Sequence, residues 1–308
     1  MTTSLTLTAP ARVTSLRSVI GSITRYGAVA TVSWGVLALI VLAALVAPLL
    51  PFYDPYTQNL GGAYLPMFAR ADDGTLHLLG TDSLGVDTLS QLLLGARLSL
   101  VIAVGSVLVS AVIGVTLGVA AGYLGGLIDR FVVVMIDVSL AVPRVLFMIP
   151  VVAVLGSSLW LLILLIGVTG WVVFARVVRT QVLSLRRRDY VDAAIMMGSG
   201  HLAVVRRHIL PNLRSSVVVL ASLDLGSVVV MEAGLSYLGL GVQPPQTSWG
   251  LMIEQAQDYI VTDPRLLIVP SIALVVLVLA INLGTRPFTA EFRPGRRRGA
   301  ESTVLPGA

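Results

Sequence analysis

The sequence predicts an all-α integral membrane protein with six transmembrane helices. The chain is 56% hydrophobic and only 12% charged, and its mean hydropathy is +0.91. Soluble domains carry about 25% charged residues, so the low charge indicates that lipid is the main solvent. Several long stretches are free of charge, and most arginines lie in the connecting segments on one side of the predicted membrane. Together these observations predict a polytopic membrane fold.

The six predicted spans follow from length and hydropathy. A helix needs about 20 apolar residues to cross the hydrocarbon core of a bilayer. The first two spans are free of charge, whereas charges or short gaps interrupt the third, fourth and fifth. In the second span, Gly114 and Gly118 form a small-xxx-small pair that permits close helix packing. The predicted spans are 28–50, 98–121, 131–155, 159–175, 215–235 and 266–283.

The arginines predict the orientation of the chain. With both termini in the cytoplasm, the inner segments carry 17 arginines and the outer segments carry three. This is the positive-inside distribution. The sequence therefore predicts a plasma-membrane protein with cytoplasmic tails at both ends. Its predicted parts are a tail 1–25, a transmembrane domain 26–285 with external loops 51–97 and 236–263 and a cytoplasmic loop 176–214, and a tail 286–308.

Composition also excludes several functions. The chain has no cysteine, which excludes disulfides and thiolate chemistry, and all 21 basic residues are arginine. A phosphate-binding P-loop needs a lysine, so the chain has no such motif. No His-Glu-x-x-His motif occurs, and none of the three histidines lies in a predicted span. From these missing motifs we expect no catalytic residue and no metal site. We also expect no nucleic-acid partner, because the positive-inside rule explains the net charge of +5.

Four charged residues lie inside the predicted spans. Asp137 and Arg144 are seven residues apart in the third span, on one helical face, and Pro143 between them is expected to kink the helix. Asp224 and Glu232 are eight residues apart in the fifth span. Charges within a bilayer are costly and are rarely without a role. They either line a polar substrate path or pair one helix with another, and a proton relay is a third alternative.

Both predicted external loops contain polar turn motifs. In the first, residues 87–91 are expected to form a short helix on the outer surface. Asp82 and Asp87 fit capping and turn hydrogen bonds better than a metal site. In the second, residues 251–259 are expected to form a short amphipathic helix.

The predicted cytoplasmic loop contains a patterned insert. Residues 190–197 predict a short helix that Gly198 or Gly200 ends with a left-handed cap. Residues 201–209 predict a second helix that Pro211 ends. Such a unit can fit a groove on a partner and move as a rigid body. His201 and His208 are seven residues apart without a third metal ligand in the loop, so we expect no metal there.

The insert resembles the EAA loop of ABC importer permeases. The resemblance lies in Asp192-Ala193-Ala194-Ile-Met-Met-Gly198, followed by His208-Ile-Leu-Pro211. Further motifs, in order along the chain, are similar to the C-type permease subunit of dipeptide and oligopeptide importers and of nickel importers. These motifs are Gly80-Thr-Asp-Ser-Leu-Gly-Val-Asp87, Gly95-Ala-Arg-Leu-Ser99, Tyr190-Val-Asp-Ala-Ala194, Glu232-Ala-Gly-Leu-Ser-Tyr-Leu-Gly-Leu-Gly241, Pro244-Pro245 and Ser248-Trp-Gly250. Val86 and Gln91 replace arginines that are common in that family.

The resemblance implies a type I ABC importer permease fold in which the insert is the coupling helix. It implies that a cytoplasmic ATPase docks on Tyr190, Asp192, Ala193, Ala194, Gly198, His208 and Pro211, and that a binding protein contacts Asp82, Asp87, Gln243 and Trp249. The implied partners are a second homologous permease, two ATP-binding subunits that hold ATP and Mg²⁺, and an extracytoplasmic substrate-binding protein or lipoprotein. Peptide is the implied substrate, and nickel and haem stay open. A proton-coupled secondary transporter is the alternative class.

Overall fold

The computed structural model describes residues 27–50, 53–72 and 74–291, and this part of the chain is almost wholly helical. Two short strands pair antiparallel, with Ala69 opposite His77. The elements in chain order are α2 (Ala28–Val46), η1 (Ala47–Leu49), η2 (Leu60–Gly62), β1 (Ala69–Arg70), β2 (Leu76–His77), α3 (Thr88–Leu124), α4 (Gly126–Ala141), α5 (Arg144–Leu155), α6 (Leu159–Arg186), α7 (Asp189–Met196), α8 (His201–Val204), η3 (Val205–Ile209), α9 (Leu210–Tyr237), α10 (Trp249–Gln255), η4 (Ala256–Tyr259) and α11 (Arg265–Glu291).

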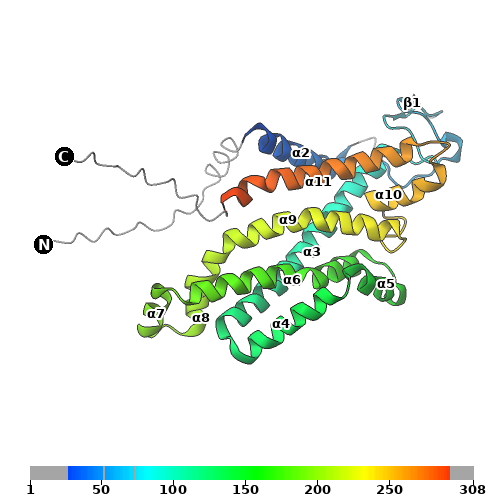
Figure 1. Ribbon diagram of the computed structural model, residues 1–308. Coiled ribbons are helices and arrows are strands. Elements are labelled where there is room, and N and C mark those ends of the chain that lie inside the picture. Colours follow the sequence, from blue (N-terminus) through cyan, green and yellow to red (C-terminus); the bar gives the residue numbers. More distant parts are fainter. Residues whose placement is uncertain (1–26, 51–52, 73, 292–308) are drawn as a thin grey trace, which may run out of the picture.

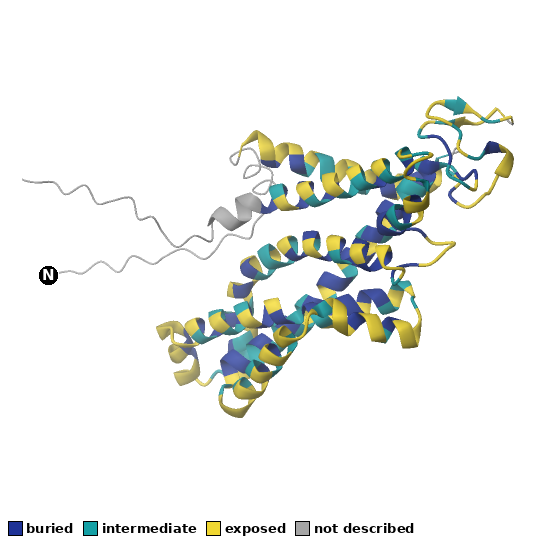
Figure 2. Cartoon of the chain, turned by 45° about the vertical axis from the view of Figure 1, so that its right-hand side comes forward, coloured by how far each residue is buried: buried dark blue, intermediate teal, exposed yellow. Residues whose placement is uncertain are grey.

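The long helices form one elongated bundle. Strand β1 and helices α5 and α10 lie at one end of it, and α7 and α8 lie at the other (Figure 1). Exposed residues continue along the outer sides of the long helices, while buried residues lie where the helices face one another (Figure 2). The exposed residues of α2 include Val32, Leu39 and Leu42, each more than 60% exposed. An apolar outer surface of this kind suits a lipid environment.

The described part of the chain has five candidate membrane spans, or six when one bent helix pair counts as a span. The five helices are long and apolar enough to span a bilayer, and the bent pair is α4–α5. Residues of α3 and α6 meet in increasing order, Gly105 at Ile163, Gly114 at Phe174 and Gly122 at Val182, so these two helices are parallel. The intervening α4–α5 must therefore carry the chain back across. This confirms the predicted fold class and the number of spans.

The third span bends at Pro143, where a kink is predicted, but it is broken into two helices and is not one continuous helix over 131–155. Helix α4 ends at Ala141, α5 begins at Arg144, and their axes differ by 83°. Val142 and Pro143 between them have extended backbone angles. The proline ring disfavours a helical conformation of the residue before it, which explains the break. Asp137 and Arg144 therefore do not share a helical face.

Two helices extend beyond their predicted spans: α3 begins earlier and α6 ends later than predicted. The predicted surface helix at 87–91 is the first turn of α3, because the Asp87 side chain caps it by accepting a hydrogen bond of 2.7 Å from the Ser90 N–H. Helix α6 continues to Arg186, beyond the predicted end of its span at residue 175. Apolar length locates the membrane portion of a helix, but it does not show where the helix ends.

Small residues allow α3 and α6 to pack closely. A Cβ atom added to Gly114 would lie 2.5 Å from the Trp171 carbonyl oxygen, and one added to Gly118 would lie 2.8 Å from that of Ala175. Ser106 and Ser110 donate hydrogen bonds to the carbonyls of Ile163 and Gly167. The predicted small-residue contact is confirmed, and it lies within one chain.

We expect Gly114→Ala to lower the stability of the protein by about 1–3 kcal/mol, because the new methyl group overpacks the contact with α6. Gly35→Ala is the matched control, because a Cβ at Gly35 of α2 meets no atom within 4 Å. Thermal unfolding in detergent, followed by tryptophan fluorescence, measures the difference. Equal midpoints for the two variants would contradict the close contact.

Candidate functional site

Helix α7 has a well-defined end. Gly198 has a φ of +83°, a conformation that favours glycine. The Gly198 N–H donates to the Ile195 carbonyl over 2.9 Å, and the Ser199 N–H donates to the Ala194 carbonyl over 3.0 Å. This pair of bonds is the Schellman motif. The prediction that Gly198 caps the short helix is confirmed.

The second helix of the insert does not end at Pro211. Residues from His201 to Tyr237 form one continuous helix, with the π-helical turn η3 just before α9. Proline removes a backbone donor and its ring crowds the carbonyl four residues earlier. Pro211 lies in the first turn of α9, and the wider turn at η3 accommodates it. The predicted stop at Pro211 is therefore wrong, and the insert is joined directly to a membrane span.

A separate hydrophobic core holds the insert to the bundle. Val191 and Ala194 of α7, together with Val204 and Ile209, are buried against the last turns of α6. The Tyr123 hydroxyl, at the end of α3, bonds to His201 Nδ1 over 3.0 Å. We call residues 189–209 the α7–α8 unit. Because its apolar side is buried against α3 and α6, this unit is fixed to the ends of these two helices.

The other side of the α7–α8 unit is open. Met196 is 86% exposed, Met197 is 80% exposed and Leu202 is 70% exposed. Tyr190, Asp192 and Ala193 are exposed beside them. Methionine side chains are flexible and adapt to partner surfaces. A short, fixed helix that exposes these apolar side chains together with the carboxylates of Asp189 and Asp192 is suited to docking a protein.

Glu232 is the centre of a buried polar network. Its side chain is 1% exposed, and its two carboxylate oxygens accept hydrogen bonds from the hydroxyls of Ser99 and Ser236, over 3.1 and 2.7 Å. Ser248 donates in turn to Ser236 over 3.2 Å. These contacts join α9 to α3 and to the start of α10. The sequence predicts that Glu232 lines a substrate path, pairs helices or relays protons. These hydrogen bonds support the pairing of helices.

Asp224 is buried without such a network. It is 8% exposed, and its Oδ2 has no hydrogen-bond partner in the part of the chain that the structure describes. A Cβ added to Gly170 of α6 would lie 3.9 Å from this oxygen and would also meet the Ser110 hydroxyl of α3. Asp224 therefore points at the contact between α3 and α6. Asp137 is exposed on α4, and Arg144 is half-buried at the start of α5.

Residues 114–297 match the family described as the binding-protein-dependent transport system inner membrane component. The chain belongs to this family. The match includes the α7–α8 unit, Asp224 and Glu232. The protein is thus a multi-pass membrane permease with the type I fold of the family, as its bundle of spans indicates.

Related permeases agree with this assignment. The chain is 41% identical over 218 residues, 70% of its length and 72% of the relative, to the glutathione transport system permease protein GsiD of Pectobacterium atrosepticum. It is 37% identical over 245 residues, 80% of its length and 81% of the relative, to the di/tripeptide transport system permease protein DppC of Pseudomonas aeruginosa. It is 36% identical over 248 residues, 80% and 87% of the two chains, to the nickel transport system permease protein NikC of Escherichia coli.

The docking residues predicted for this permease lie on the α7–α8 unit, except Pro211, which lies in the first turn of α9. His208 packs beside Tyr190, with ring centroids 6.1 Å apart. Ala194 faces the buried core, whereas Pro211 is exposed at the base of α9. Gly198 is exposed at the turn. The structure thus brings the predicted set to one end of the bundle, and it adds two highly exposed side chains, Met196 at the end of α7 and Met197 directly after it.

The four residues predicted to contact a binding protein differ in their hydrogen bonding and in their exposure. Asp82 accepts hydrogen bonds from the N–H groups of Leu84 and Val86, and Asp87 caps α3, so both stabilise the loop. Trp249 is 2% exposed and donates to the Leu92 carbonyl over 2.8 Å. This burial removes Trp249 from the accessible candidates, because it packs where Gly95 leaves room in α3. Gln243 is exposed.

The two departures from the family pattern, Val86 and Gln91, lie in the segment predicted to be external. Val86 is 4% exposed, where an arginine would have to be buried. The Gln91 side chain donates to Asp82 Oδ2 over 2.7 Å. Elsewhere in the loop, hydrogen bonds from the backbone N–H groups of Thr57 and Tyr56 hold the pKa of Asp54 below its ordinary value.

Some positioning residues were not apparent from the sequence. The guanidinium of Arg179 forms two hydrogen bonds with the carboxylate of Asp129, 50 residues away, and joins α6 to α4. Ser99 and Tyr123 also act through partners that are distant in sequence, Glu232 and His201. Serines in otherwise apolar spans were the available signal. Their partners depend on helix pairing, which a single sequence does not show.

We expect Glu232→Ala to lower the stability of the protein by about 2–3 kcal/mol, because it leaves the hydroxyls of Ser99 and Ser236 without their acceptor. Asp224→Ala is the comparison, since Asp224 Oδ2 accepts no hydrogen bond within the described chain. It should change stability much less. Unfolding midpoints in detergent test the order, and a larger loss for Asp224→Ala would contradict it.

Proposed function

We propose that this permease is the membrane-spanning subunit of an ATP-driven importer that carries small peptides into the cytoplasm. The single observation that carries the proposal is the α7–α8 unit, a rigid insert with an exposed methionine surface on a chain of the binding-protein-dependent permease family. The peptide substrate is supported by two relatives whose names specify glutathione and di- and tripeptides. The NikC relative makes nickel the second candidate.

The proposed orientation places the α7–α8 unit in the cytoplasm. The positive-inside distribution of arginine supports it, and both described chain ends, at α2 and α11, lie toward the α7–α8 end of the bundle (Figure 1). Two ATP-binding subunits dock on the unit, and they hold the ATP and Mg²⁺. A second permease completes the pathway, and a substrate-binding protein delivers the peptide to the opposite face. The chain itself carries no P-loop lysine and no catalytic role.

The proposed mechanism is alternating access. Closure of the ATPase pair moves the α7–α8 unit, which the second core fixes to α6 and α3 and which the continuous helix joins to α9. The motion therefore tilts several spans together. Hydrolysis and product release restore the first state. A proton-coupled carrier would need no such unit.

The subunit composition tests this proposal. The chain is purified from its native membranes in mild detergent, and co-purifying proteins are identified by mass spectrometry. We expect a second permease and a P-loop ATPase in stoichiometric amounts. Two results together would refute the importer: the chain purifies without partners, and an imposed proton gradient drives uptake by the chain alone. They would favour a secondary transporter.

The cap of α7 provides a test of coupling. We expect Gly198→Ala to reduce peptide uptake severalfold while ATP hydrolysis continues, because an alanine at a φ of +83° strains the turn and reorients α7. Gly200→Ala is the matched control, since neither glycine has a neighbour within 4 Å and Gly200 has an ordinary φ of −64°. The ratio of uptake to hydrolysis in proteoliposomes is measured. An unchanged ratio for Gly198→Ala would argue against the unit as the coupling element.

Asp224 is proposed to contribute a polar group to the transport pathway. Its unpartnered oxygen at the α3–α6 contact supports the proposal. We expect Asp224→Asn to reduce uptake at least severalfold while the assembled complex is recovered in normal amount. Loss of the complex on a native gel would instead assign Asp224 to helix or subunit pairing.

A further inference from the structure

A groove lies at the end of the bundle opposite the α7–α8 unit. It has a volume of about 780 Å³ and lies between the loop at Tyr64–Met67 and the segment that joins α10 to α11. A second cavity, of about 310 Å³, shares Asp258 and Tyr259 with it and continues past Glu254. We call these two adjoining cavities, which share Asp258 and Tyr259 in their linings, the groove.

The walls of this groove are held rigidly. The guanidinium of Arg265, at the start of α11, donates to the carbonyls of Leu65, Leu79 and Thr81 over 2.9, 2.6 and 2.9 Å. It also pairs with Asp263 over 2.6 Å. Gly80 has no room for a side chain beside this guanidinium. The loop wall and the helical wall are thus fixed relative to each other, so the groove is present before any partner binds.

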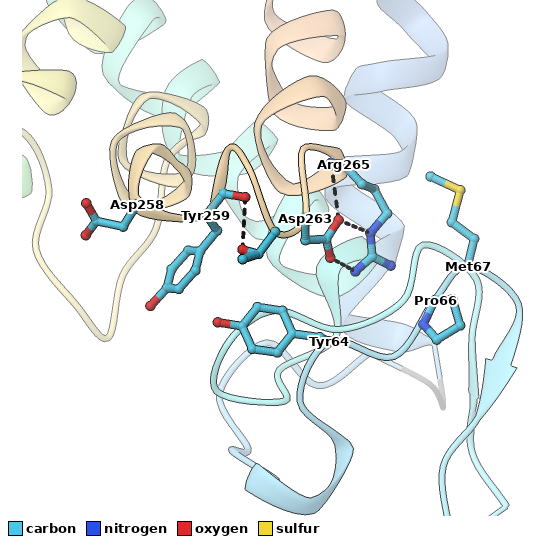
Figure 3. A pocket seen from close by; sticks show the side chains of 8 residues that line it. Tyr64, Pro66, Met67, Asp258, Tyr259, Asp263 and Arg265 are labelled. Carbon is cyan, nitrogen blue, oxygen red and sulfur yellow. Dashed lines mark hydrogen bonds and ion pairs between the residues drawn. The ribbon is translucent and has the colours of Figure 1, made fainter.

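Two tyrosines form the centre of the groove. The rings of Tyr64 and Tyr259 meet edge to face, with centroids 5.7 Å apart. In Figure 3 their hydroxyl ends point to the same side, and Asp258 lies beyond them. Tyr64 has a φ of +59° and is 42% exposed. A glycine would adopt this backbone conformation without the strain that the Cβ atom of Tyr64 causes.

The charge of the groove is unbalanced. Asp263 is neutralised by Arg265, and the carboxylate of Asp82 is occupied by hydrogen bonds within the loop. Within the described residues, no hydrogen bond or ion pair reaches the carboxylates of Asp258 or Glu254. Segments 51–97 and 236–265 together carry eight acidic residues and three arginines. This face therefore favours a cationic partner.

We propose that the groove receives a lysine or arginine side chain from the surface of the substrate-binding protein. This proposal rests on the proposed function and specifies the chemistry of docking. The aliphatic part of the side chain packs on Tyr64 and Tyr259, whose ring faces attract a cation. Its charge lies between Asp258 and Glu254. Charge complementarity of this kind raises the association rate and sets the register of docking.

The test measures binding of the purified substrate-binding protein to the assembled importer in lipid nanodiscs, at low and high salt. We expect the double variant Glu254→Gln and Asp258→Asn to weaken binding about tenfold at low salt and to show a smaller salt dependence. Asp72→Asn is the charge control, because Asp72 is exposed but does not line the groove. It should leave binding nearly unchanged.

A second pair of variants separates docking from folding. Tyr64→Gly removes the ring and relieves its backbone conformation, so we expect weaker binding with unchanged or higher thermal stability. Phe68→Gly is its control, because Phe68 has a similar φ of +62° but lies outside the groove lining. We expect it to bind normally.

Each outcome decides the proposal. If the binding protein binds wild type and all the variants equally, the groove is not its docking site, while the importer assignment stands. If it does not bind wild-type importer at all, the proposed function itself fails. A fluorescent dipeptide applied without the binding protein is the third probe. If the groove variants lose this dipeptide and retain the binding protein, the groove binds substrate and the proposal is overturned.

Discussion

The close contact between α3 and α6 is the constraint on which the rest of the structure depends. Glycines let the two backbones approach, and serine hydroxyls bond to carbonyls across the contact. In a bilayer there is no hydrophobic force between helices, so packing and hydrogen bonds of this kind hold spans together. Because the pair is parallel, α4–α5 has to cross between them in the opposite direction. The carboxylate of Asp224, on α9, points at this contact.

The bundle has two ends with different physical character. At one end, a second hydrophobic core fixes the α7–α8 unit and leaves methionines on its open side. At the other end, hydrogen bonds rather than a core organise the external loop, through Thr81, Asp82 and Arg265. Mechanical rigidity at both ends suits a protein whose partners act from both sides of a membrane.

Much of this architecture could be predicted from the sequence because lipid imposes simple rules. Apolar length gave the six spans, and the left-handed cap at Gly198 and the short helix before it were predictable from local chemistry. Long-range pairing was not predictable. The partners of Glu232 on α3 and of Arg179 on α4 depend on which helices are neighbours. The effect of Pro211 was misjudged because a π-helical turn can absorb a proline that would otherwise end a helix.

The hydrogen bonds of Arg265 have a consequence for biogenesis. The loop carbonyls that it binds belong to residues 65–81, which leave the ribosome nearly two hundred residues before Arg265 does. Only the last span supplies the guanidinium that closes the loop. Until α11 inserts, the external loop lacks these bonds and is open to proteolysis. Completion of this loop therefore depends on synthesis and insertion of α11, and a chain truncated before Arg265 lacks these bonds.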